Sequence, residues 1–127
     1  DINDTSLIMK LYHGDFSFLF TGDLNEDVGS YLAESSDKLS ADVLKIPHHG
    51  IEPIAPEIFF EKVAPRCGLV SAPGQFWRGQ MGTRIRSWFA ERNIPVYVSG
   101  ILGHVSVIVE DGALIIRPEL AEIDQAK

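Results

Sequence analysis

The sequence has a single cysteine, fewer basic than acidic residues and no long run of apolar residues. Because Cys67 is alone, an internal disulfide bond and a cysteine-rich zinc site are both excluded. No apolar stretch approaches the ~20 residues that a membrane-spanning helix needs, and no signal peptide is visible. We therefore expect a soluble domain, either cytoplasmic or attached to a membrane protein, that makes no direct membrane contact itself.

Acidic residues outnumber basic ones by 18 to 11, which gives a formal net charge of −7. A chain this acidic repels nucleic acid unless basic groups cluster locally or metal ions neutralise the contact face. Arg78, Arg84 and Arg86 form the one basic cluster in the sequence. They either contact phosphates or line a solvated helix face, and the solvated face is the default interpretation.

At 127 residues the chain has the size of one domain, and it contains no repeat or low-complexity tract. Its first residue is Asp1 rather than methionine, which we interpret as processing or as a piece of a longer protein. We treat residues 1–127 as a single unit with a polar tail, 119–127, that is expected to fray.

Hydrophobic patterning predicts an α/β (α+β) fold in which a mixed sheet carries flanking helices. Apolar runs at residues 6–12 and 16–22 predict a β-hairpin with His13 exposed at its turn. The other expected elements are helices at 25–35, 56–63 and 83–93 and strands at 41–46, 67–72, 94–99, 104–110 and 113–118. Residues 73–82 are expected to form a loop, in which Phe76 and Trp77 are either core residues, the favoured interpretation, or a stacking surface.

Two of the predicted strands end in residues that can bind metal ions. Thr21-Gly22-Asp23 follows one strand, and Pro47-His48-His49-Gly50 follows another. Ligands of open α/β sheets bind at the carboxyl ends of strands, and carboxylate and imidazole groups suit Zn²⁺, Mn²⁺ or Fe. Alternatively, Asp23 caps the following helix and the histidines lie in an exposed loop. Spacing alone indicates a possible metal site with too few ligands to be closed.

The run "NDTSLIMKLYHGDFSFLFTGDL", followed by "ADVLKIPHHG", resembles the metallo-β-lactamase superfamily. Within it, the chain is most similar to the C-terminal hydrolase domain of ComEC-type DNA-internalisation competence proteins of bacteria. The resemblance is strong over residues 3–50 and weak to about residue 117. It implies the second half of a metallo-β-lactamase αββα sandwich, and a parent protein that is a metal-dependent hydrolase of phosphodiesters such as nucleic acids.

The resemblance also implies roles for individual residues. Asp23 would bridge two divalent ions, Zn or Mn, which lower the pKa of a bound water. His48 and His49 would be catalytic residues above the metals, and His49 is our candidate for the second metal ligand. One of the two histidines would bind a metal ion, or would contact the scissile phosphate and protonate the leaving group. The implied partners are the N-terminal half of the domain, or a second copy of the chain, and a nucleic acid or other phosphodiester substrate.

Several features depart from the family pattern. The main ligand motif, H-x-[HD]-x-D-H, is absent, and Ile51 stands where the family usually has serine. The loop after the strand at 67–72 has no histidine, and His104, the remaining downstream histidine, is interpreted as structural. We therefore expect this chain alone to be inactive. A non-catalytic binding or scaffold module is the alternative, and an unrelated α/β domain with an accidental H-H-G is a third interpretation.

Overall fold

A mixed five-stranded β-sheet forms the centre of the chain, of which the computed structural model describes residues 1–120. The strand order is β1-β2-β3-β4-β5, with β1 antiparallel to β2 and the other neighbours parallel. The strands are β1 Met9–His13, β2 Phe16–Phe20, β3 Val43–Lys45, β4 Cys67–Pro73 and β5 Val96–Val98. The predicted fraying of the tail beyond residue 120 lies outside the described residues.

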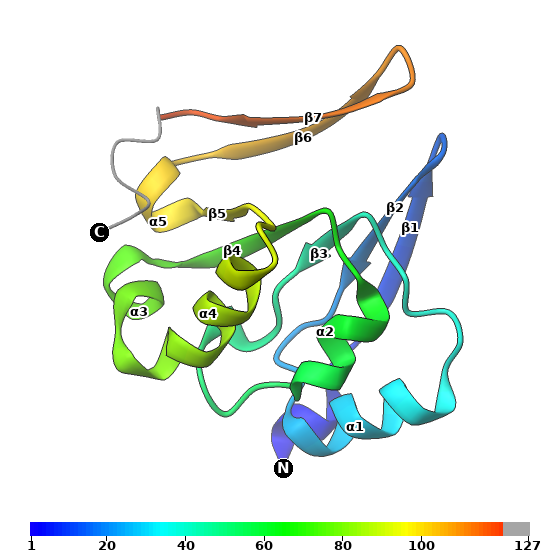
Figure 1. Cartoon of the computed structure of the whole chain (residues 1–127), viewed down its shortest axis with the longest axis vertical. Helices are drawn as coiled ribbons and strands as arrows, with labels where there is room; N and C mark the ends of the chain where they lie inside the picture. The colour runs from blue at the N-terminus through cyan, green and yellow to red at the C-terminus, as the bar shows by residue number, and fades with distance from the viewer. Residues whose placement is uncertain (121–127) are drawn as a thin grey trace.

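Helices cover one face of this sheet, and a separate two-stranded hairpin lies over the other (Figure 1). The α-helices are α1 Glu26–Ser35, α2 Glu57–Val63, α3 Gly74–Arg78, α4 Thr83–Glu91 and α5 Ser99–Leu102. The 3-10 turns are η1 Ile2–Thr5, η2 Pro47–Gly50 and η3 Gln80–Gly82. The hairpin consists of β6 Val105–Glu110 and β7 Ala113–Pro118.

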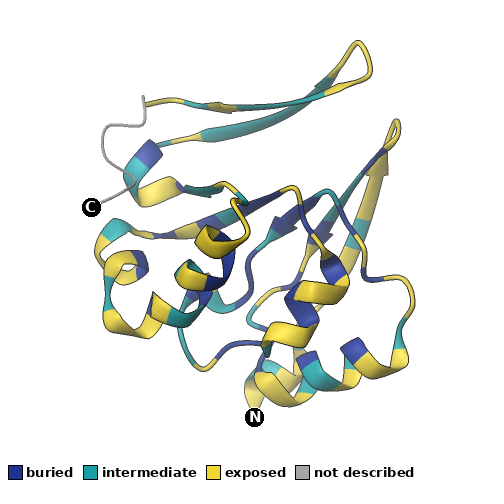
Figure 2. Ribbon diagram, in the orientation of Figure 1, coloured by how far each residue is buried: buried dark blue, intermediate teal, exposed yellow. Residues whose placement is uncertain are grey.

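The hydrophobic core lies between the sheet and the helices, where buried side chains from both layers meet (Figure 2). Leu44 from the sheet is fully buried, as is Phe60 from α2. The ring of Phe60 lies 5.6 Å from that of Trp88 and 6.0 Å from that of Phe89 on α4. Tilted and edge-on aromatic pairs of this kind each add about 1 kcal/mol beyond the burial of their area. This aromatic cluster fixes α2 and α4 against the strands that carry the candidate site.

The opposite face of the sheet is apolar but only partly covered. Because side chains alternate along a strand, Phe18 and Phe20 of β2 point away from the helices that bury Leu19. A groove of about 540 Å³ separates this face from the hairpin, and the two phenylalanines line it. Leu11 is 53% exposed and Phe20 is 39% exposed. We call this partly covered apolar surface, which includes Leu11, Phe18 and Phe20, the open face.

The predicted mixed sheet with flanking helices is confirmed, including a hairpin at each end of the chain. The expected loop at 73–82 instead contains α3 and η3. These elements have five and three residues, and so short a segment shows no helical periodicity. Pro56 was expected at the first position of α2, but it is the residue before the helix begins.

Within residues 1–120, no helix is both long enough and apolar enough to cross a membrane.

The single thiol should be unreactive in the folded chain. Cys67 is 3% exposed, and its burial raises the pKa of the thiol to about 11. At pH 8 the reactive thiolate is therefore only about a thousandth of the total. We expect no labelling of the native chain by a thiol-reactive disulfide reagent at pH 8, and full labelling in guanidinium chloride. Rapid stoichiometric labelling of the native chain would contradict the buried position of β4.

Candidate functional site

The two turns singled out in the sequence lie side by side at one edge of the sheet. The strands before them, β2 and β3, pair in parallel, with Phe20 opposite Lys45. Both turns therefore leave the sheet at the same end. The Thr21 hydroxyl donates to the Lys45 carbonyl at 2.7 Å, and the His48 amide donates to the Gly22 carbonyl at 3.1 Å. These hydrogen bonds tie the Thr21-Gly22-Asp23 turn to the Pro47–Gly50 turn.

Asp23 and His49 face each other across this junction. Nε2 of His49 lies 3.6 Å from Oδ1 of Asp23, and the side chains are 48% and 43% exposed. The ring centroids of His48 and His49 are 6.4 Å apart. The structure thus brings Asp23, His48 and His49 to one partly exposed edge, and all three remain accessible to a ligand.

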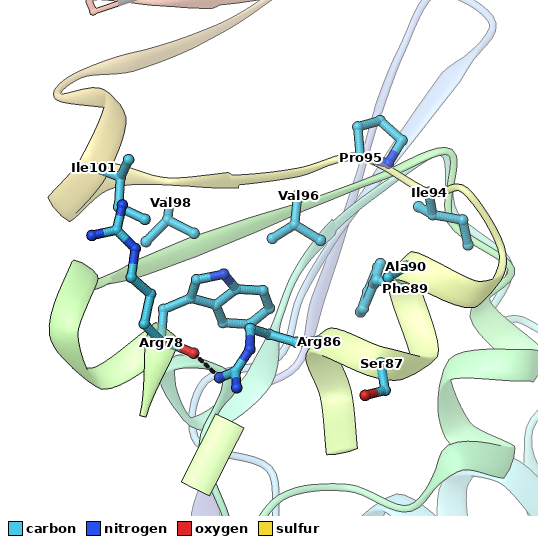
Figure 3. A pocket seen from close by; sticks show the side chains of 11 residues that line it. Arg78, Arg86, Ser87, Phe89, Ala90, Ile94, Pro95, Val96, Val98 and Ile101 are labelled. Atoms are coloured by element: carbon cyan, nitrogen blue, oxygen red, sulfur yellow. Dashed lines mark hydrogen bonds between the residues drawn. The ribbon is translucent and has the colours of Figure 1, made fainter. Parts of the chain in front are cut away.

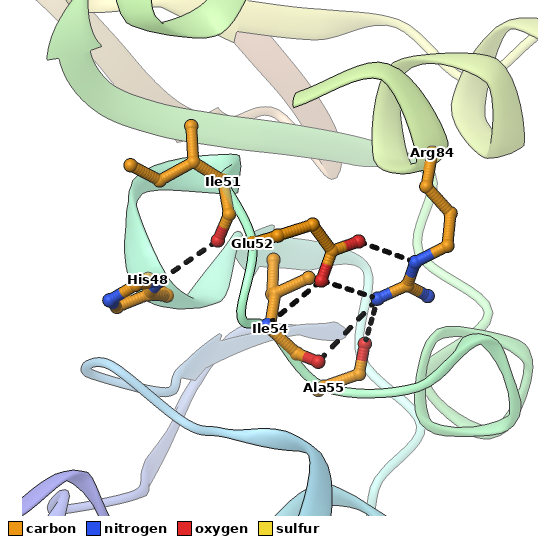
Figure 4. A network of polar contacts seen from close by, with 6 residues as sticks. All are labelled: His48, Ile51, Glu52, Ile54, Ala55 and Arg84. Atoms are coloured by element: carbon orange, nitrogen blue, oxygen red, sulfur yellow. Dashed lines mark hydrogen bonds and ion pairs between the residues drawn. The ribbon is translucent and has the colours of Figure 1, made fainter. Parts of the chain in front are cut away.

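Hydrogen bonds to the backbone set the orientation of both imidazole rings. Nδ1 of His48 lies 2.8 Å from the Ile51 carbonyl (Figure 4), and Nδ1 of His49 lies 2.7 Å from the Ser71 carbonyl. Because a carbonyl oxygen only accepts, each Nδ1 must carry the proton that it donates. In the neutral ring Nε2 then has a free lone pair. Histidines that ligate metals are commonly held in this way by a carbonyl or carboxylate.

The backbone of this turn is left-handed at three consecutive residues. The φ angles are 47° at His48, 57° at His49 and 78° at Gly50. Residues other than glycine adopt this region at a cost of about 1–3 kcal/mol, although histidine is among the types that tolerate it better. Surrounding contacts must therefore hold the turn in place.

Trp77 on α3 supplies one of these contacts. A Cβ atom added to Gly50 would lie 2.7 Å from Cζ3 of the Trp77 ring, so glycine is required by both packing and conformation. Trp77 is 8% exposed, whereas its neighbour Phe76 is 53% exposed. The favoured interpretation of this aromatic pair as core residues is confirmed for Trp77 and wrong for Phe76. Sequence reasoning missed that Trp77 supports the histidine turn, because it placed residues 73–82 in a loop.

An ion pair fixes the segment that follows the histidines (Figure 4). Nε of Arg84 donates to Oε1 of Glu52 at 2.5 Å, and Nη2 donates to Oε2 at 3.2 Å. Nη2 also donates to the Ala55 carbonyl at 3.2 Å. The hydrogen bonding of Arg84 to the Glu52 carboxylate is the main cause that raises the pKa of Arg84 above its usual value. The default interpretation of Arg84 as part of a solvated face is wrong, because this guanidinium anchors the loop to α4.

Arg86 also binds the protein itself rather than solvent. Its guanidinium donates to the Trp77 carbonyl (Figure 3) and, at 2.8 Å, to the Gly79 carbonyl. Arg86 and Arg78 line a pocket of about 440 Å³, where the side chain of Arg78 extends toward Ile101. The three arginines therefore do not form one basic patch, since Arg84 and Arg86 are committed to internal acceptors.

The described residues do not make a complete metal centre. Among residues 1–120, no group of three or more histidine, cysteine, aspartate or glutamate side chains is arranged to hold a metal ion. His13 lies at the end of β1, and His104 lies just before β6, where its amide donates to a Glu119 carboxylate oxygen at 3.0 Å. A two-metal centre would need donors beyond Asp23, His48 and His49.

Comparison with known proteins shows one partial similarity. No family model matches the chain. Seventy residues, or 55% of the chain, align at 31% identity with ComE operon protein 3 of Bacillus subtilis (strain 168). The aligned segment covers 9% of that protein, so the chain spans a small fraction of its relative's length. The similarity supports the predicted link to ComE-type competence proteins, whereas the metallo-β-lactamase resemblance stays a prediction.

Replacing Trp77 with alanine should destabilise the chain and release the histidine turn. Loss of a buried tryptophan ring costs about 3–5 kcal/mol, and here it also removes the surface on which Gly50 packs. Urea unfolding should show this loss, and the NMR signals of His48 and His49 should shift or broaden.

The matched control is Phe76→Ala, one residue away and largely exposed, which should change stability by less than about 1 kcal/mol. Equal effects of the two substitutions would contradict the supporting role of Trp77.

Proposed function

We propose that this chain is part of a metal-dependent hydrolase that cleaves phosphodiesters of the nucleic-acid type. The observation that carries the proposal is the approach of Nε2 of His49 to Oδ1 of Asp23, 3.6 Å apart at the ends of adjacent parallel strands. The similarity to ComE operon protein 3 supports the competence link from which the proposed nucleic-acid-type substrate is taken.

The proposed roles follow from the chemistry of the three side chains. Asp23 and His49 are the proposed ligands of a Zn or Mn ion. Oδ1 of Asp23 and Nε2 of His49 face the same space, and Nδ1 of His49 is already bound to a carbonyl. His48 is the proposed general acid. Its Nδ1 proton is committed to the Ile51 carbonyl, so a second proton on Nε2 is the one it would donate to a leaving-group oxygen.

Because the described residues supply too few donors, the remaining ligands in this proposal come from elsewhere in the parent protein. The open face gives another segment a place to pack, since it exposes Leu11 on β1 and Phe20 on β2, the strand that leads into Asp23. The N-terminal half of the proposed sandwich, or a second copy of the chain, is the proposed partner. The 127-residue chain alone is then inactive.

A non-catalytic binding or scaffold module is the second candidate function. The lack of a three-donor group within residues 1–120 favours it, as does Ile51 in place of the family's usual serine. In that case Asp23 and His49 form an ion pair when the imidazole is protonated, and the pair stabilises the junction between the two turns.

Metal analysis and turnover of the intact parent protein distinguish the two candidates. We expect stoichiometric Zn or Mn by mass spectrometry, together with hydrolysis of bis(4-nitrophenyl) phosphate. Asp23→Asn and His49→Gln should each lower activity by at least about tenfold, because they remove proposed ligands. His104→Gln, at an exposed histidine just before β6, is the matched control and should retain activity. A metal-free parent without turnover would favour the scaffold.

The open face should cause the isolated chain to associate with itself. We expect light scattering to give a mass above the 14.1 kDa monomer, because patches of exposed apolar side chains mark association surfaces. The double variant Leu11→Ser, Phe20→Ser should shift the chain toward monomer. Ile58→Ser, which removes a similarly exposed side chain from α2, should not. A monomeric wild-type chain would contradict the expectation that this face needs a cover.

A further inference from the structure

Lys45 is a cation beside the candidate site to which the proposed function gives no role. It is the last residue of β3, and it lies three positions before His48. Its side chain lines the groove on the open face, together with Phe18, Phe20 and Leu69. An ammonium group in mainly apolar surroundings is costly unless charged or polar partners compensate it.

The partners that the structure provides for this ammonium are few. Within residues 1–120, Nζ donates to the Gly22 carbonyl at 3.5 Å, the outer limit of a hydrogen bond. A lysine ammonium has three donors, so most of its capacity is directed elsewhere. Burial lowers the pKa of Lys45, whereas the nearby charge of Asp23 opposes this effect.

The position of Nζ connects it with the site. The Gly22 carbonyl that Nζ contacts also accepts the His48 amide at 3.1 Å. Gly22 immediately precedes Asp23, whose carboxylate faces His49. The ammonium therefore lies at the junction of the two turns, and an anion bound there would lie next to the site residues.

We infer that Lys45 binds a phosphate group of the ligand, pairing its ammonium with a non-bridging oxygen while the ligand occupies the Asp23–His49 edge. The inference rests on the proposed function for its assignment of the ligand as a phosphodiester. It adds a specificity-determining residue, because a cation on the wall of an apolar groove selects an anionic ligand. The charge of Lys45 also offsets the acidic charge of the chain locally. The competing role is structural, in which Lys45 only closes the Gly22 turn.

Phosphate binding to the 127-residue chain tests this inference without metal or turnover. The chain is titrated with inorganic phosphate in EDTA at constant ionic strength and followed by amide NMR, at a concentration below the onset of association. We expect shifts at Gly22, Asp23 and His48. Lys45→Met and Lys45→Gln should weaken binding by at least about tenfold, because a charged hydrogen bond is lost. Lys45→Arg should restore it.

The control is Lys62→Met, which removes an exposed lysine from α2 and should leave phosphate affinity unchanged. Unchanged affinity in a folded Lys45→Gln variant, or wild-type shifts that avoid the Gly22 turn, would overturn the inference. In an active parent, Lys45→Gln should raise KM more than it lowers kcat, an effect that a purely structural role does not predict. If phosphate binding depends on Lys45 but the parent protein is metal-free and inactive, Lys45 remains an anion-binding residue and the proposed hydrolase function is wrong.

Discussion

The hydrogen bond from the His48 amide to the Gly22 carbonyl is the contact on which the candidate site depends. It continues the parallel pairing of β2 and β3 by one step beyond the sheet. Without it, the two turns would leave the sheet independently, and Asp23 and His49 would have no reason to face each other. The left-handed backbone at His48, His49 and Gly50 is tolerated because this bond, the packing of Trp77 and the Arg84–Glu52 ion pair hold both ends of the turn.

The sequence allowed the mixed sheet, its terminal hairpins and the candidate residues at the ends of two strands to be predicted. Asn25 precedes α1 and accepts from the Val28 amide, as expected of an N-cap. Parallel strands with polar carboxyl-terminal turns predict an edge site, so Asp23, His48 and His49 could be selected from pattern alone. Their distances could not be predicted, because these depend on ring orientations set by the Ile51 and Ser71 carbonyls.

The elements that the sequence did not reveal are short and depend on tertiary contacts. Trp77 lies in a five-residue helix that has no periodicity to detect, and its role becomes visible only where Gly50 approaches its ring. Lys45 likewise ends a strand in an ordinary apolar run, and only the sheet geometry shows that it lines the groove. Arg84 and Arg86 illustrate the same limit, because arginines with internal acceptors cannot be distinguished from solvated ones by their spacing.

The β6–β7 hairpin has a consequence for the order in which the chain opens. None of its residues is fully buried, and it pairs only with itself rather than with the five-stranded sheet. Its amides are therefore expected to exchange with deuterium through local fluctuations, whereas the amides of β3 and β4 are expected to exchange only when the whole chain unfolds. Local opening of the hairpin would therefore leave intact the aromatic cluster that packs α2 and α4 against the sheet.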